Sequence, residues 1–155
     1  MNKENILKLA KRIREAEFAN NDSPSKAPFG FNMGYVAHSC GTPSCIAGFG
    51  YVMRLEDLLG ENIDEKTVDI YTDRFREMLG DYTTYEAVIS WLDIPFDDGK
   101  KMFEPREILS WVQITPDEAA TMLENYVATG QVDWSHTAEM KARNVEGGLT
   151  DLVKP

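Results

Sequence analysis

Residues 38–48 read HSCGTPSCIAG and hold both cysteines of the chain and one of its two histidines. Within this stretch Thr42 is a favourable N-cap residue, and Pro43 suits the first position of a helix. Apolar side chains then recur at helical spacing, at Ile46, Phe49, Val52 and Met53. The stretch therefore predicts a turn that leads directly into a helix over residues 43–59.

Helical patterns continue on both sides of this turn. Residues 1–20 are amphipathic, and two capping-box patterns begin later helices, one from Thr83 through Leu92 and one after Thr115, closed by Gly130. The other predicted helices cover residues 64–79 and 96–103, the second interrupted by Gly99. Alternating apolar residues over 29–35 indicate a short extended segment. We expect one mainly α domain over residues 1–155, with about six helices, at most a small β-hairpin, and a loosely held tail over residues 145–155.

The chain is acidic, with a formal charge of −10. Residues 27–135 contain 19 acidic and 7 basic residues, so this part alone carries −12. Binding to nucleic acid or to an anionic membrane depends on clustered Lys and Arg, so both partners are disfavoured. The sequence also lacks a long apolar run and the apolar block of a secretory signal, which predicts a cytoplasmic protein. Ordinary solvation explains most acidic surfaces, and a basic protein partner is the alternative explanation.

A family resemblance rests on the pattern Cys40-Gly41-Thr42-x-x-Cys45-Ile46-Ala47-Gly48. This pattern resembles the shared core of a group of short uncharacterised proteins encoded by phages and bacteria. The segments WLDIPFDDGKKMFEP and ITPDEAATMLENYVATGQVDW extend the similarity, which covers residues 29–134. Members commonly continue with Trp and Ala, where this chain has Phe49 and Gly50. The resemblance implies a small helical fold and a phage origin, and it supplies no activity or catalytic residue.

The cysteine motif has a structural interpretation that needs no cofactor. Free cysteine is among the most buried residue types, so both thiols are expected to act as small apolar side chains beside a capped turn. Small residues in the following helix would let a neighbouring element approach closely. The residues assigned to this structural motif are Cys40, Gly41, Thr42, Cys45 and Gly48.

Two chemical alternatives remain open for the same motif. His38, Cys40 and Cys45 could ligate a metal, although structural zinc normally takes four ligands. Cys45 would otherwise lie in the first turn of a helix, where the positive end of the helix dipole favours a thiolate. A thiol hydrolase would then use Cys45 as nucleophile and His136 as base, with Asp133 or Asn144 orienting the histidine.

Two surfaces are candidates for binding a partner. Asp69, Asp73 and Glu77 are spaced four residues apart along one flank of the helix predicted over residues 64–79. Trp111, with the apolar residues around it, would form an interface or a homodimer contact if exposed. The function that the sequence favours is a non-enzymatic accessory or inhibitory protein that binds a host macromolecule, a basic or nucleic-acid-binding protein. A thiol-dependent hydrolase or a metal-binding protein centred on Cys45 is the second hypothesis.

Overall fold

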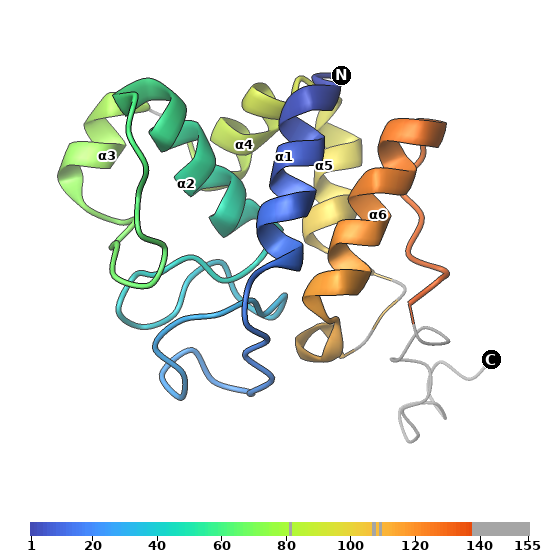
Figure 1. Cartoon of the computed structure of the whole chain (residues 1–155), viewed down its shortest axis with the longest axis horizontal. Coiled ribbons are helices and arrows are strands. Elements are labelled where there is room, and N and C mark those ends of the chain that lie inside the picture. Colours follow the sequence, from blue (N-terminus) through green and yellow to red (C-terminus); the bar gives the residue numbers. More distant parts are fainter. Residues whose placement is uncertain (81, 107, 109, 138–155) are drawn as a thin grey trace.

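The fold is mainly α, as the sequence predicts (Figure 1). The computed structural model describes residues 1–80, 82–106, 108 and 110–137, so the predicted tail over residues 145–155 lies outside the described residues. Within these residues the helices are α1 (Lys3–Arg14), α2 (Ile46–Leu59), α3 (Asp73–Met78), α4 (Thr84–Leu92), α5 (Phe96–Phe103) and α6 (Pro116–Thr129), with a short 3-10 turn, η1 (Trp111–Gln113).

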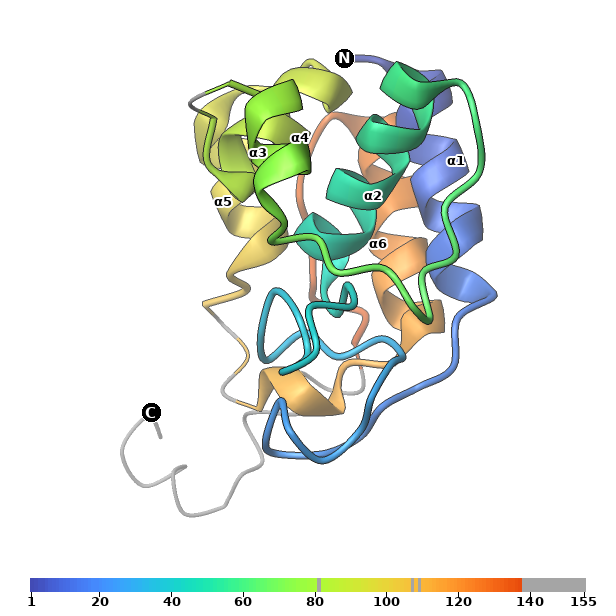
Figure 2. The ribbon, with the colours of Figure 1, turned by 90° about the vertical axis from the view of Figure 1, so that its left-hand side faces the viewer.

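The helices pack above an irregular base formed by the chain between α1 and α2 (Figures 1 and 2). Helix α1 lies along α6 and also contacts α2, and α2 packs against α4. The sequence allows at most a small β-hairpin, and the described residues form isolated β-bridges between Phe18 and Phe31 and between Ala37 and Pro43. Among the described helices, none is long and apolar enough to cross a membrane.

Local capping explains the helices whose bounds the sequence predicts well. Thr83 and Thr115 each accept a hydrogen bond from the backbone of the third helical residue, whose glutamate returns a bond to the cap, so both capping boxes are present. Gly130 ends α6 in the left-handed conformation, with φ of 77°. Gly99 does not interrupt α5; it lies inside the helix, buried against Ile89.

Three predicted boundaries are wrong because contacts distant in sequence override the local pattern. Helix α1 ends at Arg14 rather than near residue 20, because Ala19 pairs with the backbone of Phe31. Helix α2 begins at Ile46 rather than at residue 43, because Ser44 donates its backbone N–H to the carbonyl of Val36 at 2.9 Å. The helix predicted over residues 64–79 is reduced to the six residues of α3.

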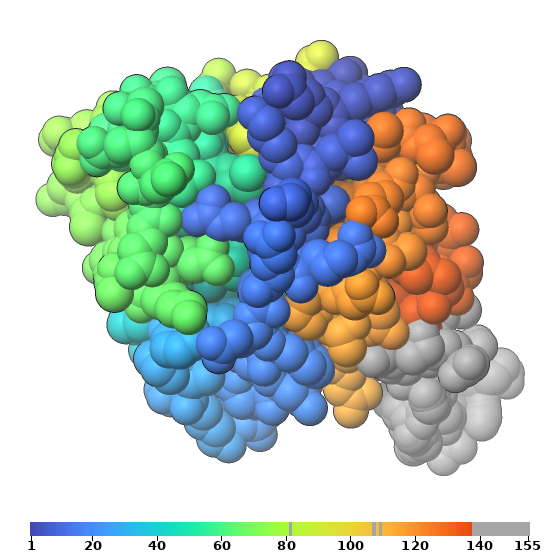
Figure 3. Space-filling model, viewed as in Figure 1, coloured from blue at the N-terminus to red at the C-terminus, as the bar shows by residue number. Residues whose placement is uncertain are grey.

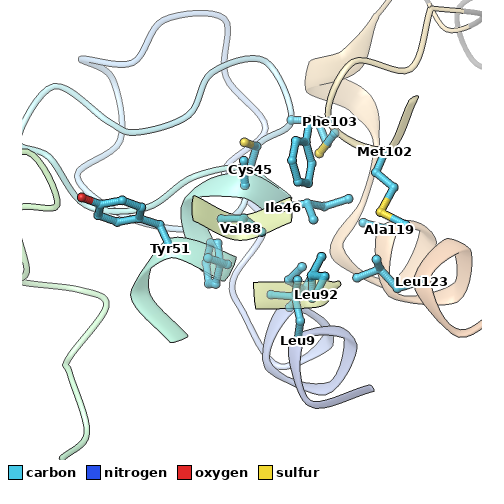
Figure 4. Packing of buried hydrophobic residues seen from close by; sticks show 14 of the residues in the cluster. Leu9, Cys45, Ile46, Tyr51, Val88, Leu92, Met102, Phe103, Ala119 and Leu123 are labelled. Carbon is cyan, nitrogen blue, oxygen red and sulfur yellow. The ribbon is translucent and has the colours of Figure 1, made fainter. Parts of the chain in front are cut away.

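The apolar faces of the helices converge on one core (Figure 4). Ile6, Leu9 and Ile13 of α1 are fully buried, and they face the described core beside residues of α6. Aromatic side chains fill the space towards the irregular base, with the rings of Phe31 and Phe49 6.0 Å apart. This core fixes the positions of the cysteine motif and of the acidic surface described below.

Candidate functional site

Cys45 is the N-cap of α2 and lies in the core rather than in the first helical turn. Its backbone is extended, its side chain makes no capping hydrogen bond, and only 2% of the residue is exposed. Figure 4 shows Cys45 among the buried apolar side chains of the core. Burial raises the pKa of the Cys45 thiol to about 11, against a smaller lowering by backbone hydrogen bonds. The thiol is therefore protonated at neutral pH, the opposite of an activated nucleophile.

Cys40 lies at the surface, contrary to the prediction that both thiols are buried. Its Sγ lies 3.1 Å from the carbonyl oxygen of Pro28, and 3.4 Å from Oγ1 of Thr42. The hydrogen bond with the Thr42 side chain lowers the pKa of the Cys40 thiol below its ordinary value. The two cysteines are free thiols in very different environments.

His38 is buried, and its side chain contacts the irregular chain between α1 and α2. Its Nε2 lies 2.7 Å from the carbonyl oxygen of Gly30, so Nε2 carries the proton that is donated there. The ring also packs edge-on to Tyr35, with 5.5 Å between ring centroids. Nδ1 has no hydrogen-bond partner among the described residues. In the part of the chain that the structure describes, no group of three His, Cys, Asp or Glu residues could hold a metal ion, so His38, Cys40 and Cys45 are not brought together as ligands.

The glycines of the motif are required by close contacts. Gly41 has φ of 91°, and a Cβ placed there would lie 2.1 Å from Oδ1 of Asp69. Its carbonyl also accepts the backbone N–H of Ile70 at 2.9 Å, which fastens the motif to the chain leading into α3. Gly48 lies against the backbone carbonyl of Val36. These contacts support the structural interpretation of the motif.

His136, the predicted catalytic base, is exposed, whereas Cys45, the predicted nucleophile, is buried. The Nε2 of His136 lies 3.2 Å from the carbonyl oxygen of Glu118 in α6. Asp133 accepts the backbone N–H of Ser135 at 2.8 Å, and Asn144 lies outside the described residues. A buried, protonated Cys45 and an exposed His136 give no support to a thiol hydrolase.

The contrast between the two thiols gives a direct labelling prediction. At neutral pH we expect iodoacetamide to modify Cys40 in the folded protein, because its thiol is exposed and its pKa is lowered. Cys45 should remain unmodified until the protein unfolds. Peptide mass spectrometry after timed labelling, with and without urea, measures both rates. Fast labelling of Cys45 in the native protein would contradict this arrangement.

The described surface also carries a strongly acidic segment, residues 55–73, which we call the acidic segment. It contains seven acidic residues and one lysine, a formal charge of −6. The segment comprises the end of α2, the chain leading to α3 and the first residue of α3, and it lies beside α1 on the face shown in Figure 3. More than half of the formal charge of −10 is thus concentrated in 19 residues.

Arg12 of α1 fixes the shape of the acidic segment. Its Nε donates to Glu65 at 2.5 Å, and its Nη1 donates to Glu56 at 2.9 Å. Its Nη2 reaches the carbonyl oxygen of Ile63 at 3.2 Å, and Glu56 in turn accepts the Ile63 backbone N–H at 2.7 Å. The side chains of Arg12, Glu56 and Glu65 are mostly buried. Their charge-assisted hydrogen bonds hold the chain between α2 and α3 against α1.

A shallow groove of about 390 Å³ opens where the acidic segment meets α1 and α4. The indole Nε1 of Trp91 in α4 donates to Oδ2 of Asp57 at 2.7 Å, and this bond joins the two sides of the groove. No ion pair engages Asp57 or Glu61 within the described residues. The residues that line the groove are Lys8, Met53, Glu56, Asp57, Gly60, Glu61, Asn62 and Trp91. Sequence reasoning missed this groove because no local pattern relates its three helices.

The two predicted binding surfaces are only partly formed. Asp73 and Glu77 lie on α3, but Asp69 precedes that helix and accepts the backbone N–H of Tyr71 at 2.9 Å, so the predicted continuous flank is wrong. Trp111 lies in η1 and is partly buried. Ile108 and Ile114, two of the apolar residues near Trp111 in the sequence, are fully buried in the core. The exposure on which an interface around Trp111 depends is therefore not found at Ile108 or Ile114.

Comparison with protein-family models, with curated proteins and with solved structures gave no match. The geometry of the acidic segment and of its groove therefore carries the functional argument.

Proposed function

We propose that this chain is a non-enzymatic accessory or inhibitory protein that binds a basic protein surface through its acidic segment. The proposal includes a cytoplasmic location and a partner that itself binds nucleic acid, because such proteins display the required Lys and Arg. It also includes a phage origin, which the family resemblance implies.

One observation carries the proposal: Arg12 ties a segment of formal charge −6 to α1 through Glu56, Ile63 and Glu65, while other carboxylates of the segment stay exposed. Electrostatic complementarity accelerates association and selects partners of opposite charge. A fixed segment loses little conformational freedom on binding, so more of the interaction free energy is retained. The buried Cys45 thiol and the separate setting of His136 give no comparable support to catalysis.

The test compares two variants of equal net charge. In the first variant, four carboxylates of the acidic segment are neutralised without a large change in shape: Asp57→Asn, Glu61→Gln, Asp64→Asn and Asp73→Asn. In the control variant, the same number are neutralised elsewhere: Glu15→Gln, Asp22→Asn, Asp97→Asn and Asp133→Asn. All eight wild-type residues are exposed.

We expect immobilised wild-type protein and the control variant to retain the same basic protein from a bacterial lysate, identified by mass spectrometry. The segment variant should lose it. With the purified partner, calorimetry should show an affinity that falls as salt rises, and less steeply for the segment variant. Equal binding by both variants, or a partner of acidic surface, would overturn the proposal.

A further inference from the structure

The groove differs from the rest of the acidic segment because it combines carboxylates with an aromatic wall. Trp91 is partly buried and lines the groove together with Met53. Asp57 and Glu61 stand exposed at its rim. An indole face attracts a cation that lies within about 6 Å of the ring centroid, and Trp is the strongest such partner. An apolar wall also suits the methylene stem of a long cationic side chain.

We propose that the groove binds one lysine or arginine side chain of the basic partner. The ammonium or guanidinium group would pair with Asp57 and Glu61, and the stem would lie along Trp91 and Met53. This inference rests on the proposed function and assigns its partner a specific contact. The hydrogen bond from Trp91 to Asp57 holds the aromatic wall beside the carboxylate that receives the cation.

Lys8 provides a second test of the proposal, with an expected change in affinity of opposite sign. It lines the same groove, and its Nζ forms an exposed ion pair with Glu4 at 3.3 Å. A fixed cation at the rim repels an incoming one, so its removal should strengthen binding. The acidic residues and Lys8 therefore predict changes of opposite sign at one site.

The probe is a tetralysine peptide with an acetylated N-terminus and an amidated C-terminus. The same peptide with all four lysines acetylated is its uncharged control. Titration at low salt is followed by the NMR signal of the Trp91 indole N–H, with the indoles of Trp111 and Trp134 as internal references. We expect the Trp91 signal to move with the charged peptide only.

Three variants test the proposed contacts. Trp91→Leu should weaken peptide binding by roughly three-fold, whereas Trp91→Phe should retain most of the affinity because it keeps an aromatic face. Lys8→Gln should strengthen binding by a factor of roughly two to three. For variants that lack the indole, the backbone amide signals of Glu61 and Asn62 report binding, and thermal melting confirms that each variant is folded.

The outcomes separate this inference from the proposed function. Equal affinities of Trp91→Leu and Trp91→Phe, or weaker binding by Lys8→Gln, would overturn the groove assignment. If the peptide moves the amide signals of residues 64–73 but not the indole signal of Trp91, the groove assignment also fails. The proposal that a basic partner binds the acidic segment is then retained. If Trp91 responds as expected but no basic partner is retained from the lysate, the proposed function fails separately.

Discussion

Gly48→Ala is expected to lower the free energy of unfolding by about 3 kcal/mol, at the upper end for overpacking a core. A Cβ at this position would lie 2.3 Å from the carbonyl oxygen of Val36. That oxygen also accepts the backbone N–H of Ser44, so it cannot move away without loss of a hydrogen bond. Pro43 also crowds this position, because its Cα would lie 3.3 Å from the added Cβ. Alanine normally stabilises a helix relative to glycine by about 1 kcal/mol, so a decrease in the free energy of unfolding would itself indicate the close contact.

Urea unfolding followed by circular dichroism measures this loss. Gly60→Ala is the matched control, because Gly60 ends the same helix with φ of 73° and nothing lies within 4 Å of its added Cβ. Only the left-handed backbone conformation then opposes alanine, at a cost of about 1 kcal/mol. A smaller loss for Gly48→Ala than for Gly60→Ala would show that the base does not press on α2 as described.

Asn32→Ala should also destabilise the protein, by about 3 to 4 kcal/mol, because it removes the centre of the irregular base. Asn32 is fully buried, and its Nδ2 donates to the carbonyl oxygens of Ala19 at 2.6 Å and Asn21 at 2.9 Å. Its Oδ1 accepts the backbone N–H of Gly34 at 2.7 Å. Alanine leaves all three backbone groups without this partner, and it also leaves a cavity.

Asn20→Ala provides the control for this second variant, since Asn20 is an exposed asparagine of the same base. We expect a change within about 0.5 kcal/mol there. Hydrogen exchange adds a local readout, because the Gly34 amide should lose protection in Asn32→Ala. Equal stabilities of the two variants would mean that the asparagine network does not organise the base.

Sequence reasoning succeeded where the structural signal is local. Each capping box, at Thr83 and at Thr115, involves only the N-cap and the glutamate three residues later. Both helices are found as predicted. It failed at the start of α2, where Thr42 and Pro43 look like a helix start. Thr42 instead donates its hydroxyl to the carbonyl of Pro28 at 2.6 Å, across 14 residues of chain.

The site was harder to predict than the fold for the same reason. The acidity of residues 55–73 is visible in the sequence, but the three contacts of Arg12 that shape this segment span 44 to 53 residues. An activated thiolate at Cys45 was expected because Cys45 was placed in the first turn of a helix. Helix α2 begins at Ile46 instead, so Cys45 is its buried N-cap. Motif spacing could not reveal that burial.

The pairing of α1 with α6 also dictates when the molecule can complete its fold during synthesis. Ile6, Leu9 and Ile13 are synthesised well before α6, the helix that lies along α1 and ends at Thr129. Until α6 leaves the ribosome, the part of α1 that α6 covers stays open to water or to a chaperone. Such long-range pairing slows folding, because a large loop must close before its contacts are gained. The contacts of Arg12 with Glu56, Ile63 and Glu65 need only the first half of the chain, whereas the core between α1 and α6 is expected to form after Thr129 has been made.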